Sequence, residues 1–245
     1  MRYLPALAAA VFAIAVWQAV VTLTGLPKFI LPGPMRVAET WWTSRALIAE
    51  HALVTGFAVL VGLAVGITLG VVTAIQLATS RTARVLIRPI LVFSQALPVF
   101  ALAPILTLWL GFGLGSKVAM AVLIIYFPVA SSFFDGLTRT PAGYLDLART
   151  MQASPRAVLW HIRIPAALPS LASGVRLAAV YAPIGVVIGE WVGASRGLGY
   201  LMLLANGRVK TDLMFAAMLT LGIFSVLLYE AARHLTRHWV REEEA

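Results

Sequence analysis

The sequence predicts an all-α, polytopic membrane protein with about six transmembrane helices. Of its 245 residues, 60% are hydrophobic and 12% are charged, about half the charged share of a soluble domain. So apolar a chain cannot cover its surface with polar groups, which excludes a disordered chain and most soluble enzymes. Several uncharged runs also reach the ~20 residues that a helix needs to cross a bilayer. Since no polar linker divides the chain, residues 1–245 are expected to form a single membrane domain.

Six stretches are the candidate spans. In chain order they are 4–24, 52–78, 89–116, 118–134, 166–194 and 213–229. All are free of Asp, Glu, Lys and Arg except the fifth, which Arg176 and Glu190 interrupt. The first follows Arg2, as the apolar part of a signal peptide would. It is long for such a segment and lacks a small-x-small cleavage site before Gly25, so an uncleaved helix is favoured.

The connection between the first two spans, residues 26–51, has one polar and one apolar side. Trp41 and Trp42 stand beside Glu39 and Arg45, which is typical of a helix that lies in a membrane interface. We therefore expect an interfacial helix here, on the outer face of the membrane.

Glycines recur at four-residue spacing in the second span, at Gly62, Gly66 and Gly70. This spacing clears one face of a helix, so that another helix can pack closely against it. Packing within the same subunit is the favoured interpretation, and contact with a second copy is the alternative.

The basic residues indicate an orientation. The net charge of +9 reflects the flanks of membrane spans rather than nucleic acid, because the chain has no basic run. An even number of spans puts both termini on one side. If that side is the cytoplasm, most of the 19 Lys and Arg residues lie inside, as the positive-inside rule requires.

The chain carries no nucleotide-binding motif. A P-loop needs Gly-Lys followed by Ser or Thr, and the three lysines, Lys28, Lys117 and Lys210, all lack that context. Any ATP and Mg must therefore be bound by a partner chain, and no cofactor is expected in this one.

Enzymatic and metal sites are not expected either. Gly193-Ala-Ser195 with His234 faintly resembles a serine-protease turn, but no glycine follows Ser195, which disfavours an intramembrane protease. His234 and His238 lie four residues apart without a third ligand nearby, so no metal site is expected. Gly193 and Gly197-Leu-Gly199 predict a tight extracellular turn.

Prolines interrupt three spans, at Pro98 and Pro104, Pro128 and Pro183, and each frees a backbone carbonyl. Irregular backbone at membrane depth is tolerated beside a wet cavity. The residues expected to line a translocation pathway are Ser94, Gln95, Pro98, Pro128, Ser131, Ser132, Pro183 and Glu190. The alternatives are helix-packing hydrogen bonds for the polar side chains and an interfacial position for Glu190.

The cytoplasmic loop of residues 140–165 predicts two short helices. Pro141 is placed to open a helix of about ten residues, and Ser154-Pro155 fits the N-cap and first turn of a second. Two short helices joined by a tight turn would form a rigid knob, which could dock into a groove on a partner.

This loop resembles the EAA loop of type I ABC importer permeases, in which E-A-A is followed by three residues, G, nine residues, I, one residue and L-P. Asp146 takes the place of Glu, Gln152 takes that of Gly, and Ile162, Ile164 and Pro165 follow in register. In the family the glycine normally makes an αL turn.

The resemblance extends over nearly the whole chain and is closest to the nitrate, sulfonate and taurine branch. The matching segments are Leu31-Pro-Gly-Pro34, Ala96-Leu-Pro98, Phe127-Pro128, Ala166-Ala-Leu-Pro169, Gly174-Val-Arg176, Gly189-Glu190-Trp191-Val-Gly193 and Gly197-Leu-Gly199-Tyr200-Leu201. It implies a type I ABC transmembrane core over residues 50–236, in a bacterial inner membrane.

The resemblance also implies partners. These are a second permease copy, two ABC ATPase subunits, and an extracytoplasmic solute-binding protein. The residues that would couple the loop to an ATPase are Asp146, Leu147, Ala148, Arg149, Gln152, Ala153, Ser154, Arg156 and Pro165. Their role would be mechanical and not catalytic.

The solute is less defined. Residues 146–151 and 199–206 look more like members that carry a pyrimidine precursor of thiamine, while others in the branch carry sulfonates, nitrate, taurine or riboflavin. No Lys or Arg lies at the middle of a span to hold an anion at depth, which favours a neutral or aromatic solute. A secondary carrier or channel without an ATPase is the alternative function.

Overall fold

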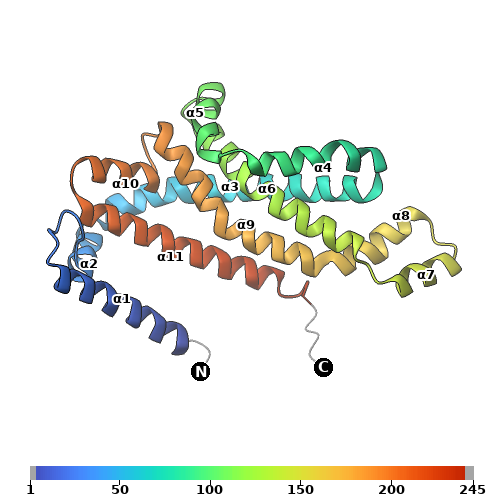
Figure 1. Ribbon diagram of the computed structural model, residues 1–245, viewed down its shortest axis with the longest axis horizontal. Coiled ribbons are helices and arrows are strands. Elements are labelled where there is room, and N and C mark those ends of the chain that lie inside the picture. The colour runs from blue at the N-terminus through green and yellow to red at the C-terminus, as the bar shows by residue number, and fades with distance from the viewer. Residues whose placement is uncertain (1–3, 241–245) are drawn as a thin grey trace. The chain divides into compact units, whose positions relative to one another are not determined.

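The computed structural model describes residues 4–240, which are helical apart from short connections (Figure 1). The helices are α1 (Leu4–Thr24), α2 (Pro34–Thr43), α3 (Arg45–Thr79), α4 (Arg81–Ala96), α5 (Val99–Leu110), α6 (Leu114–Thr138), α7 (Ala142–Thr150), α8 (Pro155–Val158), a π-helical turn (Leu159–Arg163), α9 (Ile164–Gly193), α10 (Leu198–Gly207) and α11 (Thr211–Thr236). The all-α class predicted from composition is confirmed.

The chain forms two compact units. One comprises residues 4–55 with Ser195–Ile223, and the other comprises Gly56–Ala194 with residues 224–240. Helices α3 and α11 each contribute residues to both units.

The larger unit is built around α6, whose apolar side chains recur every fourth residue. Ala121, Ile125, Val129, Phe133 and Leu137 are all at most 1% exposed. This spacing puts them on one side of the helix, where they belong to one core cluster with residues of α3 and α9. Burial of this apolar stripe therefore holds the three helices together.

The glycines of α3 permit that packing. A Cβ atom on Gly62 would lie 2.8 Å from the Cβ of Ala121, and one on Gly66 would lie 2.6 Å from Ile125. One on Gly70 would lie 2.8 Å from Val129. The glycine face of α3 thus contacts α6 of the same chain, which confirms the favoured interpretation of the spacing.

Four helical stretches of the described chain are long and apolar enough to cross a membrane. They are α3, α6, α11 and the continuous stretch Pro155–Gly193. Helices α4 and α5 can add a fifth crossing only as a bent pair, since they meet at 104°. The 21-residue α1 matches the first predicted span and is apolar over Ala8–Thr24.

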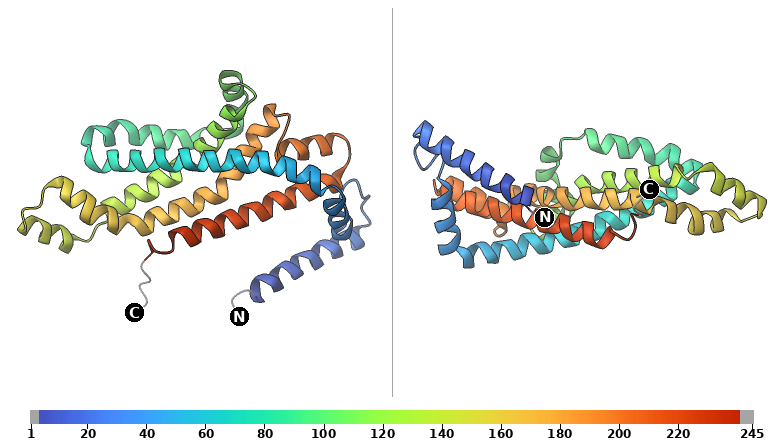
Figure 2. Two further views of the ribbon diagram at one scale, coloured as in Figure 1. Left: turned by 180° about the vertical axis from the view of Figure 1, so that it is seen from behind. Right: turned by 90° about the horizontal axis from the view of Figure 1, so that it is seen from below.

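The predicted span 89–116 is therefore wrong as a single helix. Helix α4 begins earlier, because the Oγ of Ser80 accepts a hydrogen bond from the N–H of Ala83 (3.2 Å) and caps it. It ends at Ala96, and Pro98 precedes the first residue of α5. Figure 2 shows α4 turning back at the end of α3.

The other prolines do not break their helices, contrary to expectation. Pro104, Pro128 and Pro183 lie inside α5, α6 and α9, each of which continues past the proline. Neighbouring helices can re-satisfy the carbonyl that such a proline frees.

The smaller unit ties helices from both ends of the chain together. The ring of Trp17 stacks on Phe215 at 5.8 Å, and Nε1 of Trp41 donates a hydrogen bond to Oγ1 of Thr220 (3.0 Å). The predicted helix over 26–51 is instead α2 followed, after Ser44, by the first turns of α3.

Candidate coupling loop and translocation pathway

The loop between α6 and α9 contains the two short helices predicted from the sequence. Pro141 is the N-cap of the nine-residue α7, and Ser154 is the N-cap of α8. The Oγ of Ser154 accepts a hydrogen bond from the N–H of Ala157 (3.2 Å), as its Ser-Pro pair predicts. Figure 1 shows α7 and α8 beyond the ends of α6 and α9.

Gln152 makes the turn between these helices. Its φ is +53°, in the left-handed region that favours glycine. Its N–H donates to the carbonyl of Arg149 (2.9 Å), and the N–H of Ala153 donates to the carbonyl of Ala148 (2.9 Å). These two bonds form a Schellman motif. Gln152 therefore adopts the conformation expected of the glycine that it replaces.

The second short helix runs into α9 without a break. Val158 and Leu159 join α8 to the π-helical turn, which ends at Arg163, and Ile164 begins α9. The stretch Pro155–Gly193 thus forms 39 helical residues.

The outer surface of the loop combines apolar side chains with one ion pair. Tyr144, Leu147, Met151 and Trp160 are 58–72% exposed. Asp146 accepts a hydrogen bond from Arg149 at 2.8 Å, and both side chains are exposed. Such a mixed surface is typical of a protein docking site.

The coupling candidates divide by exposure. Ala148 is 3% exposed and faces the inside of the loop. The remaining candidates lie on the surface, and they are Asp146, Leu147, Arg149, Gln152, Ala153, Ser154, Arg156 and Pro165. Pro165 lies in the first turn of α9.

The pathway candidates all lie in the larger unit, on three groups of helices. Ser94 and Gln95 are near the end of α4, and Pro98 lies at the bend before α5. The Oγ of Ser94 donates to the carbonyl of Leu91 (2.7 Å), and Gln95 is exposed. The bend therefore gathers three of the candidates.

The candidates on α6 are Pro128, Ser131 and Ser132. A Cβ on Gly174 of α9 would lie 3.1 Å from the Cβ of Ser132 and 3.2 Å from the carbonyl oxygen of Pro128. These two residues are thus part of the close contact between α6 and α9, while Ser131 is half-buried.

The candidates on α9 are buried within the chain. Pro183 is buried, and Glu190 is 1% exposed. Lys117 of α6, 7% exposed, is a neighbour of Gly189, since a Cβ on that glycine would lie 3.1 Å from the Cα of Lys117.

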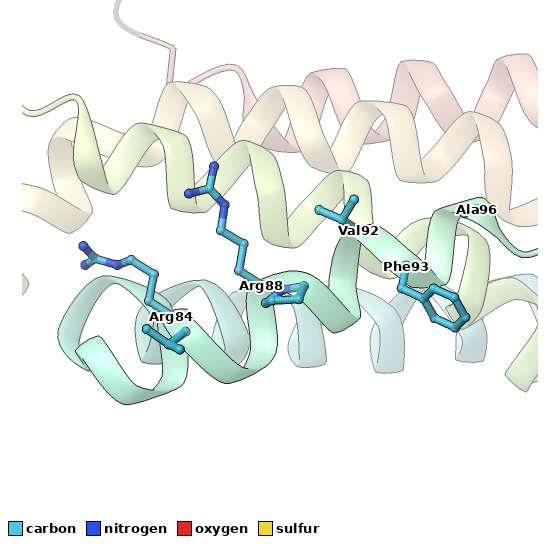
Figure 3. Close-up of a pocket in the computed structure, with 7 residues that line it drawn as sticks. Arg84, Arg88, Val92, Phe93 and Ala96 are labelled. Carbon is cyan, nitrogen blue, oxygen red and sulfur yellow. The ribbon is translucent and has the colours of Figure 1, made fainter.

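A groove of about 680 Å³ runs along α4 (Figure 3). Its lining is apolar apart from two guanidinium groups, and the residues are Arg84, Val85, Arg88, Pro89, Val92, Phe93 and Ala96. Arg84 donates to the carbonyls of Leu77 (3.1 Å) and Ala78 (3.3 Å) and lies over the ring of Phe134. Arg84 therefore provides hydrogen-bond donors for carbonyl groups in the last turn of α3.

This groove was not predicted from the sequence, because the predicted span began only at residue 89, after the first half of α4. The signal was available in the spacing. Arg81, Arg84 and Arg88 recur at intervals of three and four, as do Val85, Pro89 and Val92.

Residues 66–241 match the family described as "Binding-protein-dependent transport system inner membrane component". The chain is 50% identical to a Haemophilus influenzae protein named "Probable ABC transporter permease protein", with 87% of each chain covered. It is 38% identical to the riboflavin transport system permease protein RibX of Chloroflexus aurantiacus, covering 93% of this chain and 85% of that protein.

A formylaminopyrimidine transport permease, ThiX of Halalkalibacterium halodurans, is 34% identical over 90% of this chain and 88% of its own length. Permeases of Escherichia coli named for taurine and aliphatic sulfonates are 28% identical.

Among solved structures, a chain of the inward-facing MetNI methionine ABC transporter superposes with a TM-score of 0.61 at 20% identity. It covers 86% of this chain and 99% of the MetNI chain, which shows a shared fold. The match over residues 66–241 and the relatives above 30% identity establish the family. The chain belongs to the inner membrane components of binding-protein-dependent transport systems, as a multi-pass permease subunit of the type I ABC importers.

Proposed function

We propose that two copies of this chain form the translocation pathway of an importer, and that two ATPase subunits drive it by binding the loop of residues 140–165. ABC importers of this family work with an ATPase and a binding protein. The observation that carries the proposal is the loop itself, an exposed and well-capped pair of helices that continues directly into α9.

The loop acts as a lever in this proposal. ATP and Mg bind to the partner ATPases, whose closure draws the two loops together. The exposed residues of α7 and its turn, from Asp146 to Arg156, provide the docking surface, and Pro155–Gly193 carries the movement into the membrane. The chain's own residues bind and transmit, and none of them takes part in hydrolysis.

The proposed orientation places both termini and the loop in the cytoplasm. The support is the excess of Lys and Arg on that side, including Arg81, Arg84 and Arg88 at the start of α4. Arg149, Arg156 and the loop then face the ATPases, and the connection between α9 and α11 faces the binding protein.

The proposed pathway follows the bend between α4 and α5. Ser94, Gln95 and Pro98 offer polar groups and irregular backbone there. Pro128, Ser131 and Ser132 on α6, and Pro183 and Glu190 on α9, are assigned to the walls behind this bend.

A small heterocyclic solute is the proposed cargo. The support is the order of similarity, because the permeases named for riboflavin and formylaminopyrimidine are 38% and 34% identical, against 28% for those named for taurine and sulfonates. In addition, Arg176 within α9 already donates a hydrogen bond to Oγ1 of Thr236 (3.3 Å). A sulfonate, nitrate or taurine is the alternative cargo.

The test uses the complete importer in lipid nanodiscs, with the candidate ATPase and binding protein. ATP turnover is measured with the binding protein loaded with a pyrimidine, riboflavin or taurine. Stimulation by one loaded solute would support the importer and name its cargo. Failure of the folded chain to associate with any ATPase would overturn the proposal in favour of a secondary carrier.

Two loop variants test the coupling residues. Asp146→Arg replaces the negative partner of the exposed ion pair with Arg149 by a positive one. Gln152→Pro removes the N–H that donates to the carbonyl of Arg149, and the proline ring cannot adopt the positive φ of residue 152. Both should lower transport and solute-stimulated ATP turnover at least tenfold, while membrane insertion stays intact.

The matched control is Glu230→Arg, because Glu230 and Arg233 form an exposed pair with the same three-residue spacing on α11. This variant should keep near-normal coupling. Unchanged uptake by both loop variants would contradict the assignment of the loop.

A further inference from the structure

Within the smaller unit, two side chains of α3 hold the start of α10. The N–H of Gly197 donates to Nδ1 of His51 (3.0 Å), and the N–H of Leu198 donates to Oγ1 of Thr55 (2.7 Å). His51 and Thr55 are four residues apart, so they share one face of α3. Gly197 itself is the N-cap residue of α10 and has a φ of +119°, which a residue with a Cβ rarely adopts.

This arrangement satisfies N–H groups that an N-cap side chain would not reach. The first N–H groups of a helix have no partner inside it, and an N-cap side chain accepts only from those of the second or third helical residue. The N–H groups of Gly197 and Leu198 instead find their acceptors on another helix, α3. The position of α10 therefore depends on the state of those acceptors.

His51 can accept this bond only as the neutral ring with its proton on Nε2. The ring is 7% exposed and stacks on Tyr200 of α10 at 5.9 Å. Glu50 and Arg196, which form an ion pair at 3.9 Å, are the charged groups that act on it. Protonation would point a second N–H at the N–H of Gly197, and the bond would be lost.

His51 directly precedes residues 52–78 of α3, the charge-free stretch predicted to cross the membrane. The helix has 35 residues, about 52 Å at 1.5 Å per residue, whereas the hydrocarbon core is about 30 Å thick. Its charge-free part begins after His51, at residue 52. We therefore place the ring of His51 at an end of the span.

Burial lowers the pKa of His51 below its ordinary value, Glu50 opposes this shift, and Arg196 adds to it. A histidine with a lowered pKa in the folded state stabilises the fold when neutral. That contribution is complete above about pH 6.5, the pKa of a free histidine, and is lost as the pH falls through the lower folded value.

We propose that His51 is a pH-sensitive latch for α10, which holds Gly197 while the ring is neutral and releases it on protonation. Thr55 does not titrate in this range, so the bond to Leu198 remains as a second, pH-independent hold. The latch rests on contacts within the smaller unit and does not depend on the identity of the solute or the ATPase. Under the proposed orientation it faces the extracytoplasmic side, where it would respond to external pH.

The first test is the ¹⁵N spectrum of histidine-labelled full-length chain in nanodiscs. The chain has four histidines, and His51→Gln identifies the signals of this one. At pH 8 His51 should show a bare Nδ1 and a protonated Nε2, and it should titrate below pH 6.5. A proton on Nδ1 at pH 8 would overturn the proposal, and this test needs only the wild-type fold.

The second test is hydrogen exchange of residues 196–201, expressed relative to the intrinsic rate at each pH. In the wild type, protection should fall at least tenfold between pH 7.5 and pH 5. His51→Gln keeps an acceptor without titrating and should abolish this dependence. The control His161→Gln, at an exposed position, should retain it. Equal pH dependence in wild type and His51→Gln would refute the latch, whether or not the importer assay succeeds.

Discussion

Val209 is a β-branched residue with a positive φ, a conformation shared in the described backbone by only one other non-glycine residue, Gln152. It closes the Schellman turn after α10, in which its own N–H donates to the carbonyl of Asn206 (3.0 Å) and that of Lys210 donates to Ala205 (2.9 Å). The turn requires a positive φ, here +58°, although a β-branched side chain disfavours that region strongly. The sequence offers no glycine at this position, so the strain is stored in the fold.

Val209→Gly should therefore stabilise the protein by about 1 kcal/mol, because strain of 1–3 kcal/mol is relieved and part of it is offset by the entropy of glycine. The side chain is 61% exposed, so little packing is lost. The measurement is the thermal midpoint in detergent. Arg208→Gly, at a φ of −97°, is the control and should lower the midpoint. A lower midpoint for Val209→Gly would contradict the strain argument.

The turn at Gln152 and the cap at Ser154 are local features, of the kind that a sequence pattern can indicate. The family pattern has an αL glycine at the position of Gln152, and Gln in that place put the tight turn in question, yet the turn forms at φ +53°. Ser154-Pro155 predicted its cap correctly. Both features are local, since they depend only on residues within a few positions. The bond from Gly197 to His51 joins residues 146 positions apart, and so no local pattern could indicate it.

At the scale of elements, the close contacts of α6 decide which helices pack together. Gly185 of α9 lies against the backbone of Ala121, since a Cβ would be 2.7 Å from its Cα. Gly66 of α3 lies closest to side-chain atoms, since a Cβ would be 2.6 Å from Cδ1 and Cγ1 of Ile125. A Cβ at Gly185 would therefore meet backbone atoms, whereas a Cβ at Gly66 would first meet side-chain atoms.

Gly185→Ala should cost more stability than Gly66→Ala. Overpacking against backbone should cost up to about 3 kcal/mol, and overpacking against a side chain, which can change its rotamer, should cost about 1 kcal/mol. Unfolding midpoints in a denaturing detergent series compare the two. Gly222→Ala, where a Cβ would meet nothing within 4 Å, is the control. An equal cost at Gly185 and Gly66 would mean that α9 shifts readily against α6.

The elements that the sequence mispredicted share one cause. Charge-free length finds the apolar middle of a helix, as it did for α6 and α11, but it misses ends that carry charge. The first half of α4, from Arg81 to Arg88, was therefore not predicted to be helical. The bend at Pro98 was not predicted either, because it lies within one continuous apolar run. The prolines inside α6 and α9 were predicted to interrupt their helices. The sequence cannot show which neighbouring groups donate a hydrogen bond to the carbonyl that each proline leaves without its helical partner.

At the scale of the whole molecule, the apolar surface exceeds what this chain covers by itself. Leu108 and Trp109 of α5 are 82% and 75% exposed, and Leu91 is the buried residue of α4. Lipid covers some exposed faces of any membrane protein. If two copies pair as proposed, we expect the groove on α4, where Val85, Val92 and Phe93 lie beside Arg88, to meet the second copy.

Cross-linking can distinguish a second copy from lipid, because the chain has no cysteine of its own. Single cysteines at Val85, Val92 and Phe93 place a thiol along the groove. In membranes, a short bifunctional maleimide should convert at least one of these variants to a covalent dimer. Phe12→Cys on α1 is the control, since it is 70% exposed but lies on a helix outside the groove, and it should stay monomeric. If all three groove variants react with a membrane-soluble maleimide yet none forms a dimer, lipid covers this face and the permease pair must meet through another surface.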